Sequence, residues 1–292
     1  MKILLLGNTG QLGWELNRTL LTLDDLIALD YPQIDMSDPD SIRSVMRKHE
    51  PDLVINATAY TNVNKAESEP ELAMAINGTG PGVLAEEANR SSIAIIHYST
   101  DYVFDGTKGT PYIEEDQPNP LSVYGKTKLA GEEAVQAVGG AYLLFRTSWV
   151  YSLRRPCFVT KVLQWARERE TLRIVDDQIS TPTWARSLAQ MTTQVMMMGI
   201  ENFTDFISKK AGLYHLSENG LCSRFEWAKA ILEEDPDKIE QVVNNLLPAK
   251  SEDFDSLAAR PTRSTLSCEK FTNTFGFKLP HWHSSLKLAM RS

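Results

Sequence analysis

Short apolar runs alternate with amphipathic segments through the first half of the chain. Continuous apolar runs predict strands covered on both faces, at 3–6, 26–29, 53–56, 93–97 and 142–145. Apolar positions at helical spacing predict helices between them, at 11–23, 41–49, 70–89 and 124–138, with Ser37 or Asp38 as the cap of the second. This alternation predicts an α/β fold, a Rossmann-type doubly wound sheet of parallel strands.

Beyond residue 150 the alternation loosens. Helical patterns recur at 157–169, 184–198 and 224–234, separated by proline-containing loops. We therefore expect a Rossmann domain over residues 1–150 and a smaller C-terminal α/β lobe over 151–292, interleaved with the last strands of the sheet.

Composition excludes some classes of binding partner and of cellular location. The net charge of -8 argues against nucleic acid, whose phosphates are bound by an excess of Lys and Arg. Three scattered cysteines, Cys157, Cys222 and Cys268, indicate reduced thiols instead of a disulfide framework. The chain contains no run of 18 apolar residues and no secretory signal pattern at its start. We expect a soluble cytoplasmic protein that binds neither membrane nor nucleic acid.

A glycine-rich turn follows the first predicted strand and opens a helix, which is the context of a dinucleotide-binding loop. Gly7 permits the tight turn, Gly10 lets backbone N–H groups approach a pyrophosphate, and Gly13 allows close packing of helix and strand. The alternative is a glycine-rich turn without a ligand. The sequence thus predicts an NAD(P)-binding first domain and assigns substrate binding to the second lobe.

Several positions after the second and third strands extend this cofactor site. Asp30, 20 residues after Gly10, is positioned to bond the adenine ribose 2′-hydroxyl, unless it is only a solvated carboxylate at a strand end. An aspartate there repels a 2′-phosphate and favours NADH over NADPH. We also expect Asp35 and Met36 to cover the adenine, and the run Ala59, Tyr60, Thr61 to line the pyrophosphate and ribose.

A tyrosine and a lysine four residues apart provide candidate proton-transfer chemistry. Tyr124 and Lys128 share one face of a helix, about 6 Å apart. A free phenol has a pKa near 10, and we expect the Lys128 ammonium to lower it by stabilising the phenolate. Thr100 follows the fourth predicted strand, where its hydroxyl is positioned to donate to a substrate carbonyl, and Asp101 to bond a sugar hydroxyl. In isolation such a pair is common by chance; with the glycine loop it indicates hydride transfer.

Longer strings around these residues resemble the extended short-chain dehydrogenases and, within them, the dTDP-4-dehydrorhamnose reductase family. The similar segments are 7–16, 62–67, 97–104, 124–132 and 145–151, with Asp177-Gln178, Pro182-Thr183 and Arg260-Pro261. The resemblance implies reduction of the C4 carbonyl of dTDP-4-dehydro-L-rhamnose by NADPH or NADH, in the synthesis of a cell-surface sugar. It implies Tyr124 as proton donor, Lys128 as its partner and Thr100 as the residue that orients the carbonyl.

The resemblance implies further roles. Gln11, Leu12 and Tyr98 fall at cofactor positions, with Gly10, Asp30 and 59–61. Thr100, Asp101 and Trp149 fall at sugar-binding positions, and Arg260 is a candidate for gripping a diphosphate. Some family members form homodimers with a magnesium ion at the interface, and Glu15 matches one of its ligand positions.

The chain also departs from the family pattern. The loop at 152–158 is shorter and more basic than usual, Tyr60 stands where His is common, and 179–181 replaces a glycine-containing stretch. Arg154 and Arg155 in that loop either grip a diphosphate or are solvated, and His281 with His283 indicates a surface turn more than a metal site. Two alternatives stay open: another nucleotide-sugar reductase or epimerase, and a non-catalytic subunit resembling the methionine adenosyltransferase beta subunit.

Overall fold

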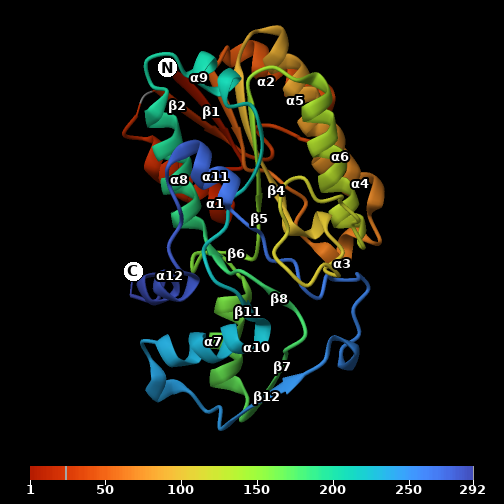
Figure 1. Ribbon diagram of the computed structural model, residues 1–292, viewed down its shortest axis with the longest axis vertical. Coiled ribbons are helices and arrows are strands. Elements are labelled where there is room, and N and C mark those ends of the chain that lie inside the picture. The colour runs from red at the N-terminus through yellow and green to blue at the C-terminus, as the bar shows by residue number, and fades with distance from the viewer. Residues whose placement is uncertain (24, 292) are drawn as a thin grey trace.

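Six parallel strands form the central sheet of the computed structural model, which describes residues 1–23 and 25–291 (Figure 1). Their order is β10–β5–β4–β3–β1–β2. The strands are β1 (Lys2–Leu6), β2 (Asp25–Leu29), β3 (Leu53–Asn56), β4 (Ala94–Thr100), β5 (Tyr142–Thr147) and β10 (Gly212–His215). The predicted α/β class and doubly wound parallel sheet are confirmed.

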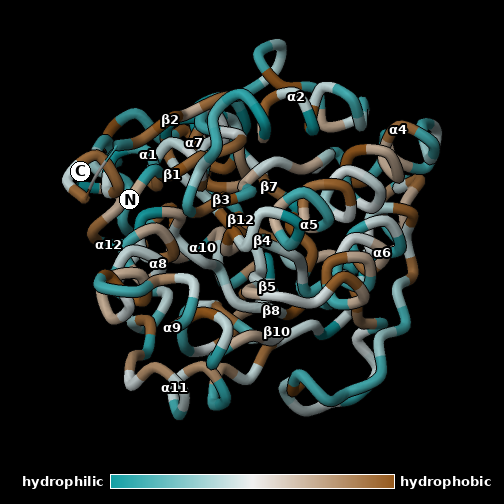
Figure 2. Tube along the Cα trace, turned by 90° about the horizontal axis from the view of Figure 1, so that it is seen from above, coloured by the Kyte–Doolittle hydropathy of each residue, from teal (hydrophilic) through white to brown (hydrophobic). Residues whose placement is uncertain are grey.

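Helices cover both faces of this sheet because its strands are apolar on both sides. Ile3 and Leu5 of β1 pack into one core cluster, and Leu4 and Leu6 pack into the other. Figure 2 shows α5 and α6 on one side of the strands and α8 and α9 on the other. The first layer holds α2 (Pro39–His49), α5 (Gly80–Arg90) and α6 (Val123–Val138); the second holds α1 (Gln11–Leu20), α8 (Ala185–Met198), α9 (Phe203–Lys209) and α11 (Glu269–Phe275).

The C-terminal half of the chain divides between this sheet and a second lobe. Its segments α8, α9, β10 and α11 return to the sheet and its core. The second lobe, in the lower part of Figure 1, packs around the buried Trp227. It contains α7 (Phe158–Glu168), α10 (Arg224–Glu234), α12 (Trp282–Ala289) and three strand pairs: β6 (Val150–Tyr151) with β9 (Thr183–Trp184), β7 (Thr171–Val175) with β12 (Asn245–Ala249), and β8 (Ile179–Ser180) with β11 (Cys222–Ser223).

The helix predicted at 70–89 is wrong in its middle. It is α4 (Pro70–Met74), then a π-helical turn at Ala75–Thr79, then α5. At the turn α6 passes so close that a Cβ on Gly131 would lie 2.1 Å from the carbonyl oxygen of Asn77. The wider turn accommodates this approach and directs the Asn77 side chain onto the main chain of Tyr60 and onto Thr127.

Other boundaries differ by a few residues. The first helix ends at Leu20 instead of residue 23, and β4 runs on to Thr100, which therefore ends the strand instead of following it. Asp38, not Ser37, caps α2, because its carboxylate accepts from the backbone N–H of Asp40.

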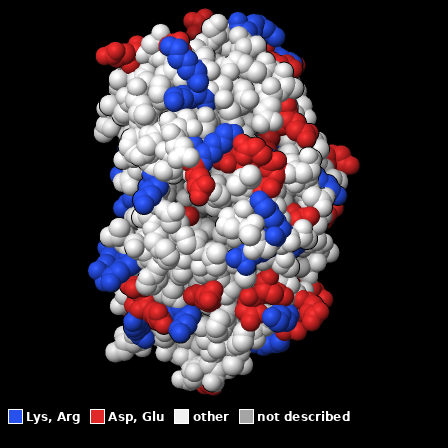
Figure 3. Space-filling model, viewed as in Figure 1, with Lys and Arg blue, Asp and Glu red and all other residues white. Residues whose placement is uncertain are grey.

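The surface carries both signs of charge. On the face shown in Figure 3, Lys and Arg side chains are interspersed with Asp and Glu. Across the described ranges, no helix combines the length and apolar character needed to cross a membrane.

Candidate active site

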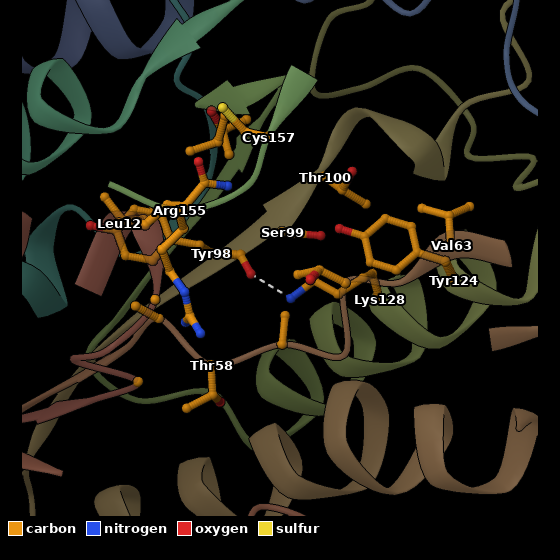
Figure 4. A pocket seen from close by; sticks show the side chains of 18 of the residues that line it. Leu12, Thr58, Val63, Tyr98, Ser99, Thr100, Tyr124, Lys128, Arg155 and Cys157 are labelled. Atoms are coloured by element: carbon orange, nitrogen blue, oxygen red, sulfur yellow. Dashed lines mark hydrogen bonds between the residues drawn. The ribbon is translucent and has the colours of Figure 1, made fainter. Parts of the chain in front are cut away.

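A cavity of about 930 Å³ lies between the carboxyl ends of the strands and the second lobe (Figure 4). The strand order reverses at β1, which has β2 on one side and β3 on the other, and ligands bind at such a point in open parallel sheets. Fifteen of the predicted site residues line the cavity: Gly7, Gly10, Gln11, Leu12, Asp30, Asp35, Met36, Ala59, Thr61, Tyr98, Thr100, Asp101, Tyr124, Lys128 and Trp149.

The glycine loop forms one end of the cavity. Gly7 has φ +85°, and a Cβ there would lie 2.9 Å from the main chain of Ala57. A Cβ on Gly13 would lie 1.9 Å from the carbonyl oxygen of Gly7, so this glycine serves packing and does not line the cavity. Gly10 is the N-cap of α1 and supplies no side-chain cap, which leaves first-turn N–H groups facing the cavity.

The acidic residue at the end of β2 is held by the glycine loop. Asp30 Oδ2 accepts from the Thr9 hydroxyl at 2.5 Å and from the Thr9 N–H at 3.1 Å. Asp35, farther along the same wall, accepts from the N–H and hydroxyl of Ser37. The cavity therefore has two carboxylates near the glycine loop, where an adenosine would lie.

The loop after β3 contributes its main chain more than its largest side chain. The Tyr60 N–H donates to Asn77 Oδ1 at 2.8 Å, and its phenol turns outward to donate to Glu69 at 2.5 Å. Tyr60 therefore does not line the cavity, in contrast to its predicted role, whereas Ala59 and Thr61 do.

Tyr124 and Thr100 meet at the middle of the cavity. Burial raises the pKa of the Tyr124 phenol well above its usual range, and a hydrogen bond to the Thr100 hydroxyl lowers it in part. The Tyr102 ring packs edge-on against Tyr124, with centroids 5.7 Å apart. The phenol is therefore protonated at neutral pH, the state required of a proton donor.

The Lys128 side chain points toward β4 and not, as the sequence predicts, toward the Tyr124 hydroxyl. Its ammonium donates to the main-chain carbonyl of Tyr98 at 2.6 Å and lies 3.4 Å from His97 Nε2 (Figure 4). Burial lowers the pKa of Lys128 to about 8, while nearby Glu132 raises it. No hydrogen bond joins Lys128 to Tyr124 in the described residues, so the expected lowering of the phenol pKa is absent from this arrangement. The buried ammonium takes a main-chain carbonyl of β4 just beyond His97, the last residue of β4 that pairs with β3.

His97 is a buried neighbour of the Lys128 ammonium. Asn56 Oδ1 accepts from the N–H and hydroxyl of Thr58, which turns its Nδ2 toward His97 Nδ1 at 3.1 Å. Because an amide nitrogen only donates, neutral His97 accepts at Nδ1 and carries its proton on Nε2. Burial and the Lys128 charge lower the pKa of His97 well below its usual value, so the ring stays neutral.

Asp101 connects the sheet to the C-terminal segments. Its carboxylate accepts from Thr100, from Ser180 of β8 at 3.1 Å and from Ser264. Burial raises its pKa to about 6, and these hydrogen bonds with the charge of Arg224 hold it from rising further.

The side chains that close the cavity from the second lobe were missed by the sequence analysis as site residues. Phe158, Arg224 and Trp227 line this end, where Trp227 stacks on Trp149 with centroids 5.5 Å apart. Single aromatic and basic residues on ordinary helical patterns provide no sequence signal for such a role.

The sequence predicts that Arg154 and Arg155 each either grip a diphosphate or are solvated, and only Arg155 lines the cavity. Arg155 enters it from the side opposite Tyr124, and its Nη1 donates to the carbonyl of Thr9 at 2.9 Å (Figure 4). Arg154 instead stacks on Trp14, with its guanidinium carbon 3.4 Å from the ring centroid.

Besides Gly13 and Tyr60, two more predicted residues, Arg260 and Glu15, do not line the cavity. Arg260 donates to Ser256 at 2.7 Å and to Asn64 at 3.1 Å. Glu15 is buried and accepts from Arg18 at 3.0 Å and Arg186 at 3.4 Å. These arginines occupy Glu15, and the described residues contain no group of three His, Cys, Asp or Glu side chains suited to a metal ion. A magnesium site at Glu15 is therefore not supported.

The residues present fit a bound dinucleotide. Gly7 and Gly10 line the cavity, and the first turn of α1, which has no side-chain cap, begins there. The hydroxyls of Ser99 and Thr147 line the cavity and are buried without a hydrogen-bond partner in the described part of the chain. Such groups need a ligand or water to satisfy them.

Comparisons with known proteins agree with this geometry. A dTDP-4-dehydrorhamnose reductase of Escherichia coli K12 is 41% identical over 292 residues, covering 98% of this chain and 96% of the relative. A crystal structure of the Clostridium acetobutylicum dTDP-4-dehydrorhamnose reductase matches with a TM-score of 0.91 and 33% identity, over 100% of this chain and 99% of that one. The Bacillus anthracis dTDP-4-dehydrorhamnose reductase, solved in complex with NADP, matches with a TM-score of 0.88 and 32% identity over the same shares. The family described as RmlD substrate binding domain matches residues 1–292, and the chain belongs to this family of dTDP-4-dehydrorhamnose reductases.

Proposed function

We propose that this chain reduces the C4 carbonyl of dTDP-4-dehydro-L-rhamnose to dTDP-L-rhamnose with NAD(P)H. The observation that carries the proposal is that Thr100 and Tyr124, joined by a hydrogen bond, line the same cavity as the glycine cradle and the indoles of Trp149 and Trp227. Relatives named dTDP-4-dehydrorhamnose reductase support the substrate. In this proposal residues 1–150 hold most of the cofactor, and residues from 151–292 hold most of the substrate.

The cofactor end supports a nicotinamide dinucleotide. The N–H groups at the start of α1 would hold the pyrophosphate, with Gly10, Gln11 and Leu12 against it. NADP bound to the Bacillus anthracis relative supports the class of cofactor. The Asp30 carboxylate, fixed by Thr9, supports a preference of this chain for NADH, because it would repel a 2′-phosphate.

In the proposed mechanism the bound cofactor supplies a hydride to the substrate C4 carbon. Thr100 and Tyr124 bond the C4 oxygen, and the Tyr124 O–H gives its proton to that oxygen as the C–H bond forms. The raised pKa of Tyr124 keeps the proton on the phenol until then. The phenolate that remains is stabilised by Lys128, once its ammonium leaves the Tyr98 carbonyl, and by the Thr100 hydroxyl.

The test is loss of NAD(P)H absorbance when the purified chain receives dTDP-4-dehydro-L-rhamnose, with dTDP-L-rhamnose identified by mass spectrometry. We expect stoichiometric cofactor oxidation and no turnover without the keto sugar. An epimerase would instead interconvert sugars with no net loss of NAD(P)H. A non-catalytic subunit would bind the cofactor and oxidise none, and either result would reject the proposal.

A further inference from the structure

A guanidinium without a carboxylate partner lies at the second-lobe end of the cavity. Arg224, the first residue of α10, lines the cavity. Across residues 1–23 and 25–291, no carboxylate oxygen lies within 4.0 Å of its nitrogens. A partly desolvated cation without a paired acid is unfavourable on its own, and an anionic ligand would offset that cost.

Aromatic rings fix the orientation of this guanidinium. Its carbon lies 3.6 Å from the centroid of Trp149 and 5.0 Å from that of Phe158. Trp149 is itself backed by Trp227, with the two rings inclined by only 13°. A guanidinium stacked on an indole keeps its N–H groups in its own plane, and five N–H groups leave a pair for a phosphate beside the hydrogen bond to Tyr102.

A second arginine adds positive charge to the same end. The hydrogen-bond partners of Arg260 are Ser256 and Asn64, both neutral, so its charge is also uncompensated by them. Arg260 lies close enough to lower the pKa of Arg224 and of Tyr102. Burial lowers the pKa of Arg224, whereas Tyr102 and then Asp101 raise it; the Asp101 oxygens already accept from three hydroxyls.

The two arginines that line the cavity have different neighbours. Arg155 lies against the glycine loop, where the cofactor pyrophosphate belongs. Arg224 lies beside the aromatic rings of Trp149 and Phe158. A reaction between a dinucleotide and a nucleotide sugar brings two diphosphates into one cavity, and Arg155 and Arg224 are one arginine for each of them.

We propose that Arg224, stacked on Trp149 and supported by the charge of Arg260, binds the diphosphate of the nucleotide-sugar substrate and so determines specificity for a nucleoside diphosphate. The identity of the sugar rests on the proposed function, whereas the binding of a diphosphate by Arg224 does not. It assigns to the second lobe a substrate contact that the sequence patterns did not indicate.

The test measures binding by titration calorimetry to the full-length chain, with TDP and thymidine as probes. In wild type we expect TDP to bind at least about tenfold more tightly than thymidine, since a hydrogen bond to a charged group contributes about 1.5–3 kcal/mol. Arg224→Met should weaken TDP binding about 10–100-fold and leave the Kd values of thymidine and NAD(P)H within about threefold. Arg224→Lys should recover part of the TDP affinity, because it restores the charge without the planar fork.

Arg169→Met is the matched control. Arg169 also faces an indole, with its guanidinium carbon 5.9 Å from the centroid of Trp165, but it is exposed and does not line the cavity. We expect this variant to bind TDP as wild type does. Circular dichroism of both Arg224 variants verifies folding, and Arg224→Lys carries the comparison if Arg224→Met does not fold.

The outcomes separate this inference from the proposed function. TDP binding unchanged in Arg224→Met, or weakened together with NAD(P)H by the same factor, overturns the inference. A wild type that shows Arg224-dependent TDP binding but no turnover of the keto sugar keeps the diphosphate site and rejects the proposed function. Turnover with Arg224-independent TDP binding rejects only the site.

Discussion

The ammonium of Lys128, on helix α6, donates a 2.6 Å hydrogen bond to the main-chain carbonyl of Tyr98 on strand β4. This bond ties α6 to the edge of β4 at the centre of the cavity. It also directs the ammonium away from Tyr124, whose pKa is raised by burial, so that the phenol stays protonated. The arrangement is suited to an enzyme that must begin its cycle with a proton on the tyrosine.

Replacing the proton donor tests the mechanism most directly. Tyr124→Phe removes the O–H and little else, so we expect kcat to fall about 10²–10⁴-fold, the usual range for a general acid. The Kd for NAD(P)H, measured by fluorescence titration, should change little. Tyr142→Phe, at a half-buried tyrosine on β5, is the control and should keep its rate. A Tyr124→Phe variant with near-normal turnover would falsify the assignment.

The buried ammonium predicts a pH-dependent stability. Folding lowers the pKa of Lys128 from 10.5 to about 8, so between these pH values the unfolded chain binds a proton that the folded chain does not. The free energy of unfolding contributed by Lys128 should therefore rise with pH from about 8 to 10.5. Below pH 8 the full penalty of the buried charge is present.

Lys128→Met should remove this penalty. We expect the variant to lose activity but to gain roughly 1–3 kcal/mol in free energy of unfolding at pH 7, less the hydrogen bond to Tyr98. Urea denaturation at pH 7 and at pH 10 measures both effects. The gain should shrink at the higher pH, and a destabilised variant at pH 7 would contradict the account.

Asp30 should determine the choice between the two nicotinamide cofactors. Asp30→Asn keeps the shape and removes the charge that repels a 2′-phosphate, so the ratio of kcat/KM for NADPH over NADH should rise about tenfold. Steady-state kinetics with each cofactor measures it. Asp35→Asn is the comparison, because Asp35 also lines the cavity but does not lie at the end of β2, where the ribose 2′-hydroxyl is expected, and it should shift the ratio far less. An equal shift in both variants would count against Asp30.

The two loop arginines offer a matched pair. Arg155 reaches the glycine loop and Arg154 stacks on Trp14, so only the first is positioned for a pyrophosphate. We expect Arg155→Ala to raise the Kd of NAD(P)H about tenfold and Arg154→Ala to raise it less than about threefold. The difference should narrow at high salt, which screens partly exposed charges. Equal effects of the two variants would show that the loop acts only as a whole.

Local patterns determined much of this protein. The apolar runs of β1 and β3, the glycine turn and the helical spacing of Tyr124 and Lys128 are all features of neighbouring residues. Periodicity and turn chemistry act over a few residues, so they predicted the sheet, the cradle and the face of α6 that carries the pair.

Packing between distant segments decided the rest. The π-helical turn at Ala75–Thr79 lies where α6 approaches closely at Gly131, and the Lys128 ammonium is directed to a carbonyl of β4. Arg224 joins the site only because the second lobe folds back over the strand ends. These features depend on contacts between residues far apart in the chain, where buried polar groups take whichever partner the fold brings within reach; no local pattern encodes that choice.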